Sequence, residues 1–135
     1  MNSLRVLLLL SLILTPSFAW AAVDDPKSFS ENIMKMVLNG ELDKANDQLD
    51  LALPKREGLF TPIKDSYKEF GSPLFIDLLR EEMLGSSIFE QIYLVRWDKK
   101  AMVFRLRFIK GNGGWFLWGL KYSNEGERIL WPGSD

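Results

Sequence analysis

The sequence contains neither cysteine nor histidine. The absence of cysteine excludes disulfides, a thiolate nucleophile and the lipid-modified cysteine of bacterial lipoproteins. The absence of histidine removes the commonest general base near neutral pH, and the two losses together remove the side chains that zinc and transition-metal sites usually require. We therefore predict no metal site and no cofactor. Any catalysis would rest on Asp, Glu, Tyr, Lys, Ser or Arg.

Motifs that hold phosphate, calcium or a catalytic serine are missing as well. The sequence has no glycine-rich phosphate loop, no calcium-loop spacing and no nucleophile elbow. Its one glycine cluster, GNGG at residues 111–114, lies between two strand-like segments and is typical of a hairpin turn. The 17 basic and 18 acidic residues nearly cancel, which argues against the broad positive surface of a general nucleic-acid-binding protein.

The first 21 residues have the pattern of a secretory signal peptide. Arg5 precedes an almost unbroken apolar run from Val6 to Leu14, and Ala19 and Ala21 occupy the two small-residue positions of a signal-peptidase site. An uncleaved membrane anchor is the alternative, but residues 15–17 end the apolar run well short of the roughly 20 residues that span a bilayer. We predict residues 1–21 as a cleaved signal peptide. Residues 22–135 are then a single exported domain, periplasmic or secreted, with no membrane span.

Helices are predicted in the first half of this domain. An acid or hydroxyl residue followed by proline marks two helix starts, at Asp25–Pro26 and Thr61–Pro62. Asn39–Gly40 and Gly71 mark helix ends, and apolar residues recur between these signals at helical spacing. The predicted helices cover about residues 26–39, 41–50 and 61–70.

The second half of the domain has the composition and alternation of β-strands. The segment AMVFRLRFIK alternates strictly, and IFEQIYLVRW and WFLWGLKY are rich in β-branched and aromatic residues. Hairpin turns are expected at residues 98–101 and 111–114. The predicted strands cover about residues 87–98, 101–110 and 114–123.

Antiparallel pairing of these strands divides their side chains between two sheet faces. With Trp97 opposite Met102 and Phe108 opposite Phe116, one face is strongly apolar and should be covered by the helices. Its predicted members are Phe89, Tyr93, Val95, Trp97, Met102, Phe104, Leu106, Phe108, Phe116, Trp118, Leu120 and Tyr122.

Three segments resemble a known group of proteins in their order along the chain. They are a helix containing MKMVLNGELDKANDQL, a helix ending in YKEFGSP, and strands containing RFIKGNGGWFLWGLKY. Together they resemble the small secreted bacterial proteins of the nuclear transport factor 2-like, or cystatin-like, superfamily, over about residues 26–124. Many members of that superfamily are domains of unknown function. The resemblance implies an α+β fold in which N-terminal helices pack on a curved antiparallel sheet of about four strands.

The resemblance also bears on residues 72–85, whose local signals conflict. Ser72–Pro73 at the start and Gly85 at the end favour a helix, whereas apolar residues on both alternating faces also fit a strand. The resemblance implies that about residues 74–84 form the first strand of the sheet. Enzymes of the superfamily use acidic and Tyr or His residues between helices and sheet, but no catalytic residue is carried over to this sequence.

The sheet face opposite the helices mixes arginine, aliphatic and tryptophan residues, a composition that interface cores favour. A second copy or a cell-envelope protein is the predicted partner of this outer face. Cover by the C-terminal residues Ile129, Leu130 and Trp131, or plain solvent exposure, are the alternatives. The predicted members of the face are Ile92, Leu94, Arg96, Val103, Arg105, Arg107, Ile109, Trp115, Leu117, Gly119 and Lys121.

The candidate binding residues lie mostly on this outer face. Arg105 and Arg107 lie two apart on one strand, so their guanidinium groups could hold a carboxylate or phosphate together. Ion pairs with Glu81, Glu82 or Glu90 are the alternative. The candidate binding set on this face is Leu94, Arg96, Arg105, Arg107, Trp115 and Lys121.

Tyr67, Asp77 and Tyr93 are the polar residues expected near a space between helices and sheet. The two tyrosines fit buried rings with a hydrogen-bonded hydroxyl, and Asp77 is the candidate catalytic carboxylate. The leading hypothesis is a non-enzymatic exported binding or assembly domain that acts through this space or through the outer sheet face. A small hydrolase or isomerase with one cavity carboxylate, and a subunit of a cell-envelope complex, are the alternatives, so whether the protein is an enzyme stays open.

We predict that the exported protein starts at Ala22, because Ala19 and Ala21 fit the small-residue pockets of signal peptidase. Mass spectrometry of the N-terminal peptide of exported protein measures this directly. An exported chain that retains Met1 would contradict the assignment.

Overall fold

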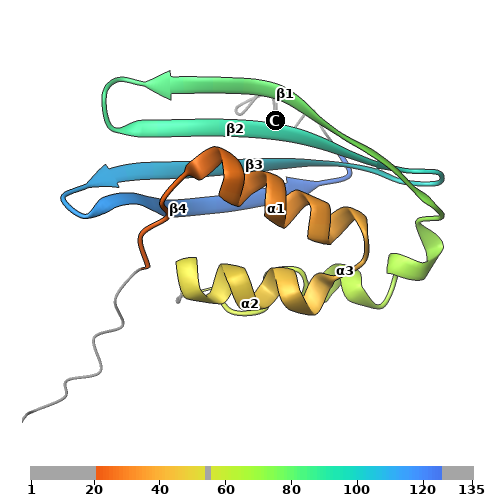
Figure 1. Cartoon of the computed structure of the whole chain (residues 1–135). Coiled ribbons are helices and arrows are strands. Elements are labelled where there is room, and N and C mark those ends of the chain that lie inside the picture. The colour runs from red at the N-terminus through yellow and green to blue at the C-terminus, as the bar shows by residue number, and fades with distance from the viewer. Residues whose placement is uncertain (1–20, 54–55, 126–135) are drawn as a thin grey trace, which may run out of the picture.

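Helices come first along the chain and strands follow, giving the computed structural model an α+β fold (Figure 1). The structure describes residues 21–53 and 56–125. The predicted signal peptide before Ala21 and the C-terminal residues 129–131 lie outside the described residues. The elements are α1 (Pro26–Leu38), α2 (Leu42–Ala52), α3 (Thr61–Lys64), the 3₁₀ turn η1 (Tyr67–Glu69), β1 (Pro73–Leu84), β2 (Ile88–Trp97), β3 (Ala101–Gly111) and β4 (Gly114–Ser123).

The four strands form an antiparallel meander in the order β1-β2-β3-β4, and α1 and α2 lie across one of its faces (Figure 1). All four predicted strands are confirmed to within one residue at either end. The ambiguous segment at residues 72–85 is a strand, and it pairs along the full length of β2. Long-range pairing therefore overrides the helix signals at its two ends.

The first helix begins and ends at the predicted signals. The Asp25 carboxylate accepts hydrogen bonds from the backbone N–H of Lys27 (3.1 Å) and from the hydroxyl of Ser28 (2.7 Å), which caps the first turn. After Leu38 the chain turns toward α2 at Gly40, whose φ of 76° is disfavoured for residues that carry a Cβ.

The predicted helix at residues 61–70 is interrupted. α3 ends at Lys64, and η1 follows as a separate 3₁₀ turn. The Ser66 hydroxyl donates a hydrogen bond to the Ile63 carbonyl (3.3 Å), and the backbone N–H groups that follow reach back three residues instead of four. A serine that competes for backbone acceptors disfavours a continuous α-helix at this point.

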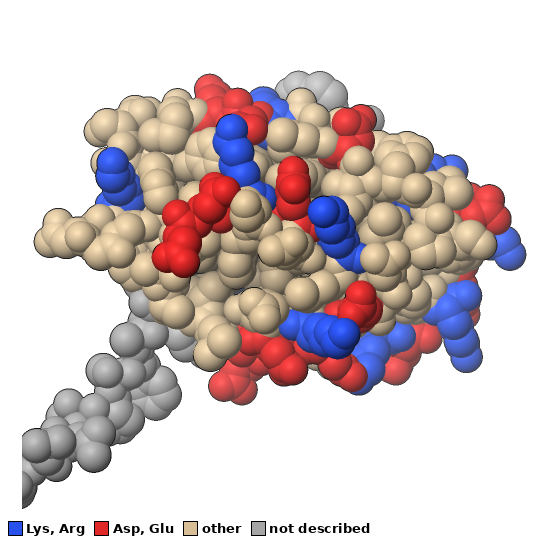
Figure 2. Space-filling model, viewed as in Figure 1, with Lys and Arg blue, Asp and Glu red and all other residues tan. Residues whose placement is uncertain are grey.

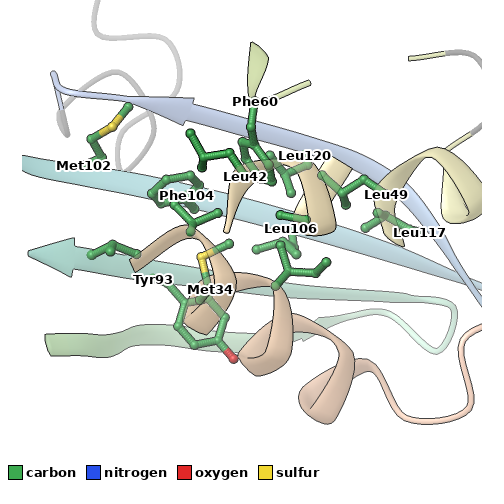
Figure 3. Close-up of a cluster of buried hydrophobic side chains, with 14 of the residues drawn as sticks. Met34, Leu42, Leu49, Phe60, Tyr93, Met102, Phe104, Leu106, Leu117 and Leu120 are labelled. Carbon is green, nitrogen blue, oxygen red and sulfur yellow. The ribbon is translucent and has the colours of Figure 1, made fainter. Parts of the chain in front are cut away.

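The helices and the sheet share one apolar core, which Figure 3 shows in close-up. Met34 from α1, Leu49 from α2 and Leu106 from β3 have no exposed surface. Nine of the twelve residues predicted for the helix-covered face are buried. They are Phe89, Tyr93, Val95, Trp97, Met102, Phe104, Leu106, Phe108 and Leu120.

Trp97 joins the helical layer to the sheet at the end of β2. Its indole N–H donates to the Leu38 carbonyl (3.0 Å), and the Tyr67 hydroxyl donates to the same oxygen (2.6 Å). A Cβ on Gly40 would lie 2.6 Å from the Tyr67 ring, so the glycine is needed for close approach as well as for its φ. One carbonyl at the C-terminus of α1 thus holds two aromatic side chains from different elements.

The predicted pairing of β2 with β3 is wrong by two residues, because Val95 and not Trp97 lies opposite Met102, but this error leaves the side chains on their predicted faces. The predicted pairing of β3 with β4 is wrong along all of β4, and in the first half of β4 it also puts the side chains on the wrong face. Phe108 lies opposite Leu117 instead of Phe116, because a register shift next to Arg107 leaves Trp118 as an extra residue in β4. Such a bulge moves every side chain beyond it to the other face. The predicted core residue Trp118 is therefore 49% exposed, and Phe116 lies opposite Ile109 and is only partly buried.

The same bulge brings two residues assigned to the outer face into the core. Leu117 is fully buried, and Trp115 packs against the core with its ring 6.2 Å from that of Phe89. Leu120 and Tyr122, on the other side of the bulge, keep their predicted face.

The burial difference between two tryptophans gives a stability test. Trp97→Ala should lower the free energy of unfolding by about 3 to 5 kcal/mol, because it leaves a large cavity and removes a hydrogen-bond donor. Trp118→Ala should cost about 1 kcal/mol or less, because that ring is half exposed. Urea unfolding followed by circular dichroism measures both. Equal losses for the two variants would contradict the bulge in β4.

Candidate anion-binding site

Three of the predicted outer-face cations gather in one pocket at the β4 edge of the sheet. Arg105 and Arg107 reach it from β3 and Lys121 reaches it from β4. The pocket has a volume of about 210 Å³. We call it the arginine pocket; its described lining is Arg56, Arg105, Arg107, Trp118, Gly119, Leu120 and Lys121.

Arg105 is the unusual member of this pocket. Only 9% of its surface is exposed, yet its guanidinium makes no hydrogen bond or ion pair with any described residue. Burial lowers the pKa of Arg105 from its ordinary value, and the positive charge of Arg107 lowers it further. Arginine nevertheless keeps its charge in proteins, and the nearby charge of Glu90 favours it, so the pocket contains a buried cation that is not directly bonded to an anion among the described residues.

Arg107, in contrast, is neutralised within the sheet. It lies opposite Glu90 on β2 and donates from Nε to that carboxylate, and Arg80 approaches the other carboxylate oxygen at 3.3 Å. Burial tends to raise the pKa of Glu90, but the hydrogen bonds from Arg107 and Arg80 outweigh it and hold the pKa below its ordinary value. The ion-pair alternative is therefore confirmed for Arg107 and does not apply to Arg105.

The bulge at Trp118 shapes one wall of the arginine pocket. It turns this half-exposed ring onto the pocket, and the neighbouring Gly119 has no atom within 4 Å of the position that a Cβ would take. Open space beside the glycine backbone allows a ligand to approach the strand closely. Trp118 was not predicted as a pocket residue, because the regular alternation of β4 placed its ring in the core.

Arg56 was missed for a different reason. It follows α2 in a loop, and only the folded chain brings it to the pocket at the β4 edge of the sheet. No local pattern around residue 56 signals this placement. With Lys121 it adds exposed positive charge around the buried Arg105.

The other predicted outer-face residues do not join the pocket. Arg96 donates to the backbone carbonyls of Trp97 and Lys100 and so stabilises the turn between β2 and β3. Leu94 packs against a small cluster on the same face, formed by the buried residues Ile92 and Val103. Trp115 lies on the core side, as described above.

The residues predicted for a space between helices and sheet are also separated. The Tyr67 hydroxyl donates its hydrogen bond to the Leu38 carbonyl. Burial raises the pKa of Tyr93 to about 12, and the negative charges of Glu31 and Glu81 add to this rise. Asp77 was placed wrongly: it is exposed on the face turned away from the helices. The two-sided pattern of β1 did not reveal which of its faces meets the helices.

A buried amide on the helix-covered face was not foreseen. Gln91 has no exposed surface, and its side chain makes no hydrogen bond of normal geometry with a described residue, although its interaction with the Tyr93 hydroxyl partly offsets the rise in the pKa of that tyrosine. The buried Ser30 hydroxyl on α1 also lacks a partner there. Unpaired groups of this kind each cost about 1 to 3 kcal/mol.

The charges elsewhere are mixed. On the helix-bearing side of the molecule, acidic and basic side chains are interspersed (Figure 2). The residues that the structure describes contain no cluster of acidic side chains that could hold a metal ion. Within the same ranges, no helix is long and apolar enough to cross a membrane.

Comparisons of the chain with models of protein families, with curated proteins and with solved structures found no match. The similarity to the nuclear transport factor 2-like superfamily therefore stays a prediction. The α+β arrangement and the arginine pocket stand on the structure alone.

The Glu90 cluster predicts a specific pH dependence. Because the folded-state pKa of Glu90 lies below its ordinary value of 4.5, its contribution to stability is complete above that pH and is lost as the pH falls through the folded-state pKa. Glu90→Gln should cost about 1 to 3 kcal/mol near neutral pH, because it removes the charge that binds Arg107 and Arg80. The difference from the wild type should shrink below pH 4.5.

Urea unfolding of both proteins at several pH values measures that difference. Glu41→Gln is a suitable control, since Glu41 is exposed and pairs only with exposed Lys44. A Glu90→Gln penalty that is independent of pH would show that the carboxylate charge does not stabilise the cluster.

Proposed function

We propose that this chain is an exported, non-enzymatic binding domain that holds an anionic ligand in the arginine pocket. The observation that carries the proposal is the buried guanidinium of Arg105, which has no hydrogen-bond or ion-pair partner among the described residues. A charge removed from water without a partner is costly, so a stable protein keeps one chiefly where a ligand completes it. Export is part of the proposal and rests on the sequence pattern of residues 1–21.

The chemistry of the pocket favours a carboxylate or a phosphate. A guanidinium presents a planar fork of donors that matches both groups, and Arg56 and Lys121 add longer-range attraction. The volume of about 210 Å³ is smaller than the roughly 300 to 1,000 Å³ of pockets for drug-sized ligands. The ligand is accordingly a small anion, or the anionic end of a larger molecule that extends over Trp118.

The acidic residues that the structure describes support a binding function better than a catalytic one. Glu90 is the only buried carboxylate among them, and its two arginines lower its pKa, whereas a general acid needs a raised one. Tyr93 holds its proton far above neutral pH. Asp77, the candidate of the hydrolase or isomerase hypothesis, is exposed on the sheet face turned away from the helices.

Arg105→Met tests the pocket, with inorganic phosphate and citrate as probes. At low ionic strength the wild type should bind at least one of them, and the variant should bind it about tenfold or more weakly, because the charged hydrogen bonds are lost. Without probe, the variant should be as stable as the wild type or more stable, because an unpaired buried charge is removed. Isothermal titration calorimetry and urea unfolding measure the two effects.

Lys68→Met is the matched control, since it removes one exposed cation on η1, outside the pocket. It should leave probe binding unchanged. Wild-type protein that binds neither probe, or equal binding by Arg105→Met, would overturn the proposal.

A further inference from the structure

β1 is an edge strand with an unusually apolar surface. It spans 12 residues, and it is the first strand in the sheet order, so only β2 pairs with it in the described structure (Figure 1). Eight large hydrophobic side chains are exposed among the described residues, and six of them belong to β1. These six are Leu74, Phe75, Leu78, Leu79, Met83 and Leu84, each 38% to 53% exposed.

β1 has register shifts of its own against β2, between Pro73 and Phe75 and between Leu78 and Arg80, but the other edge of the sheet has further protection. β4 has the bulge at Trp118, and the backbone N–H of Val23 bonds to the carbonyl of Trp115 (2.7 Å), which covers that end of the strand. The exposed Lys121 adds charge to the same strand. Bulges, cover and lysines are the means by which proteins prevent edge strands from pairing with other chains. β1 is longer than β4, and its exposed side chains are more apolar. Along its edge away from β2, its backbone groups have no strand partner among the described residues.

The charges of β1 are arranged so that the strand is complementary to itself. If two copies of β1 pair antiparallel along their full length, Pro73 of one lies opposite Leu84 of the other. In that same register Asp77 of each copy lies opposite Arg80 of the other. Both residues lie on the sheet face turned away from the helices, since they pair with Leu94 and Ile92 of β2, and the register shift between Leu78 and Arg80 is what brings residues three apart to one face. The strand's only basic residue therefore meets an acid in the register that uses every residue of the strand.

Asp77 is available for such a pair. It forms no ion pair within the described chain, whereas Arg80 lies 3.3 Å from Glu90 and 3.7 Å from Glu82 with almost half of its side chain exposed. An arginine with five donors can keep Glu90 and still bind a second carboxylate. A neighbouring copy would give Asp77 its missing partner.

We propose that β1 is a homodimer interface, in which the β1 strands of two copies pair antiparallel and join their sheets into one of eight strands. The exposed apolar side chains of β1 then lie beside their symmetry mates on both faces, where they lose contact with water. This surface lies at the edge of the sheet opposite the arginine pocket, so the inference does not depend on the proposed function.

Charge reversal tests the register. Asp77→Arg places two arginines opposite each other twice in the dimer and should raise its dissociation constant about tenfold to a hundredfold. Asp47→Arg, which makes the same change at an exposed site on α2, should leave the constant unchanged. Analytical ultracentrifugation of protein purified from its host, from low micromolar to sub-millimolar concentration, measures these constants.

A complementary variant distinguishes loss of the interface from loss of the fold. Arg80→Asp should also weaken its own dimer, because it brings two acids together. Mixing the Asp77→Arg and Arg80→Asp proteins should restore a dimer, because both opposite pairs are then of unlike charge. Only pairing in this register explains such a rescue.

Amide hydrogen exchange gives a readout on the wild type alone. Protection of residues 73–84 should increase with protein concentration, while β4 stays unchanged. A wild-type protein that is monomeric at sub-millimolar concentration would overturn the inference. It would also be overturned by a dimer that Asp77→Arg leaves intact, or by β1 pairing with a chain of different sequence.

Discussion

The bulge at Trp118 is the constraint that determines how the side chains of β4 are divided between the two faces of the sheet. A single extra residue in β4 decides which aromatic side chains fill the core and which line the surface, because strand side chains alternate. It places Trp115 and Leu117 under the helices and leaves Trp118 and Gly119 beside Arg105. Core packing at one end of the strand and a cationic pocket at its middle are therefore consequences of the same local irregularity.

The outer face combines two ways of accommodating charge within a sheet. Glu90 is almost inaccessible and is stabilised by Arg107 and Arg80, so these three residues form a closed structural cluster. Arg105 lies two residues before Arg107 on β3 and is also buried, but it has no ion-pair partner among the described residues. The contrast between two arginines on the same strand is more informative than the presence of either, because it separates an arginine that is paired within the sheet from the one for which we propose a ligand.

Most of the fold could be predicted from the sequence, and the arginine pocket only in part. Strand limits and the start of α1 depend on local signals such as alternation and the Asp25 cap, and these signals agree with the structure. The bulge could not be predicted, since "GGWFLWGLKY" is compatible with two registers that differ by one residue. Asp77 was misplaced because both faces of β1 are apolar, and Arg56 because a loop residue reaches the pocket only through tertiary structure.

The order of the strands has a consequence for the rate at which the chain folds. Each strand pairs with its neighbour in sequence, so the sheet can grow hairpin by hairpin with short loop closures. Distant segments are joined mainly by the contacts between helices and sheet, among them the hydrogen bonds of Leu38 with Trp97 and of Leu59 with Tyr122. These contacts would be made last, when helices and sheet dock. A topology of this kind favours rapid assembly in a chain that has no disulfides to guide or lock it.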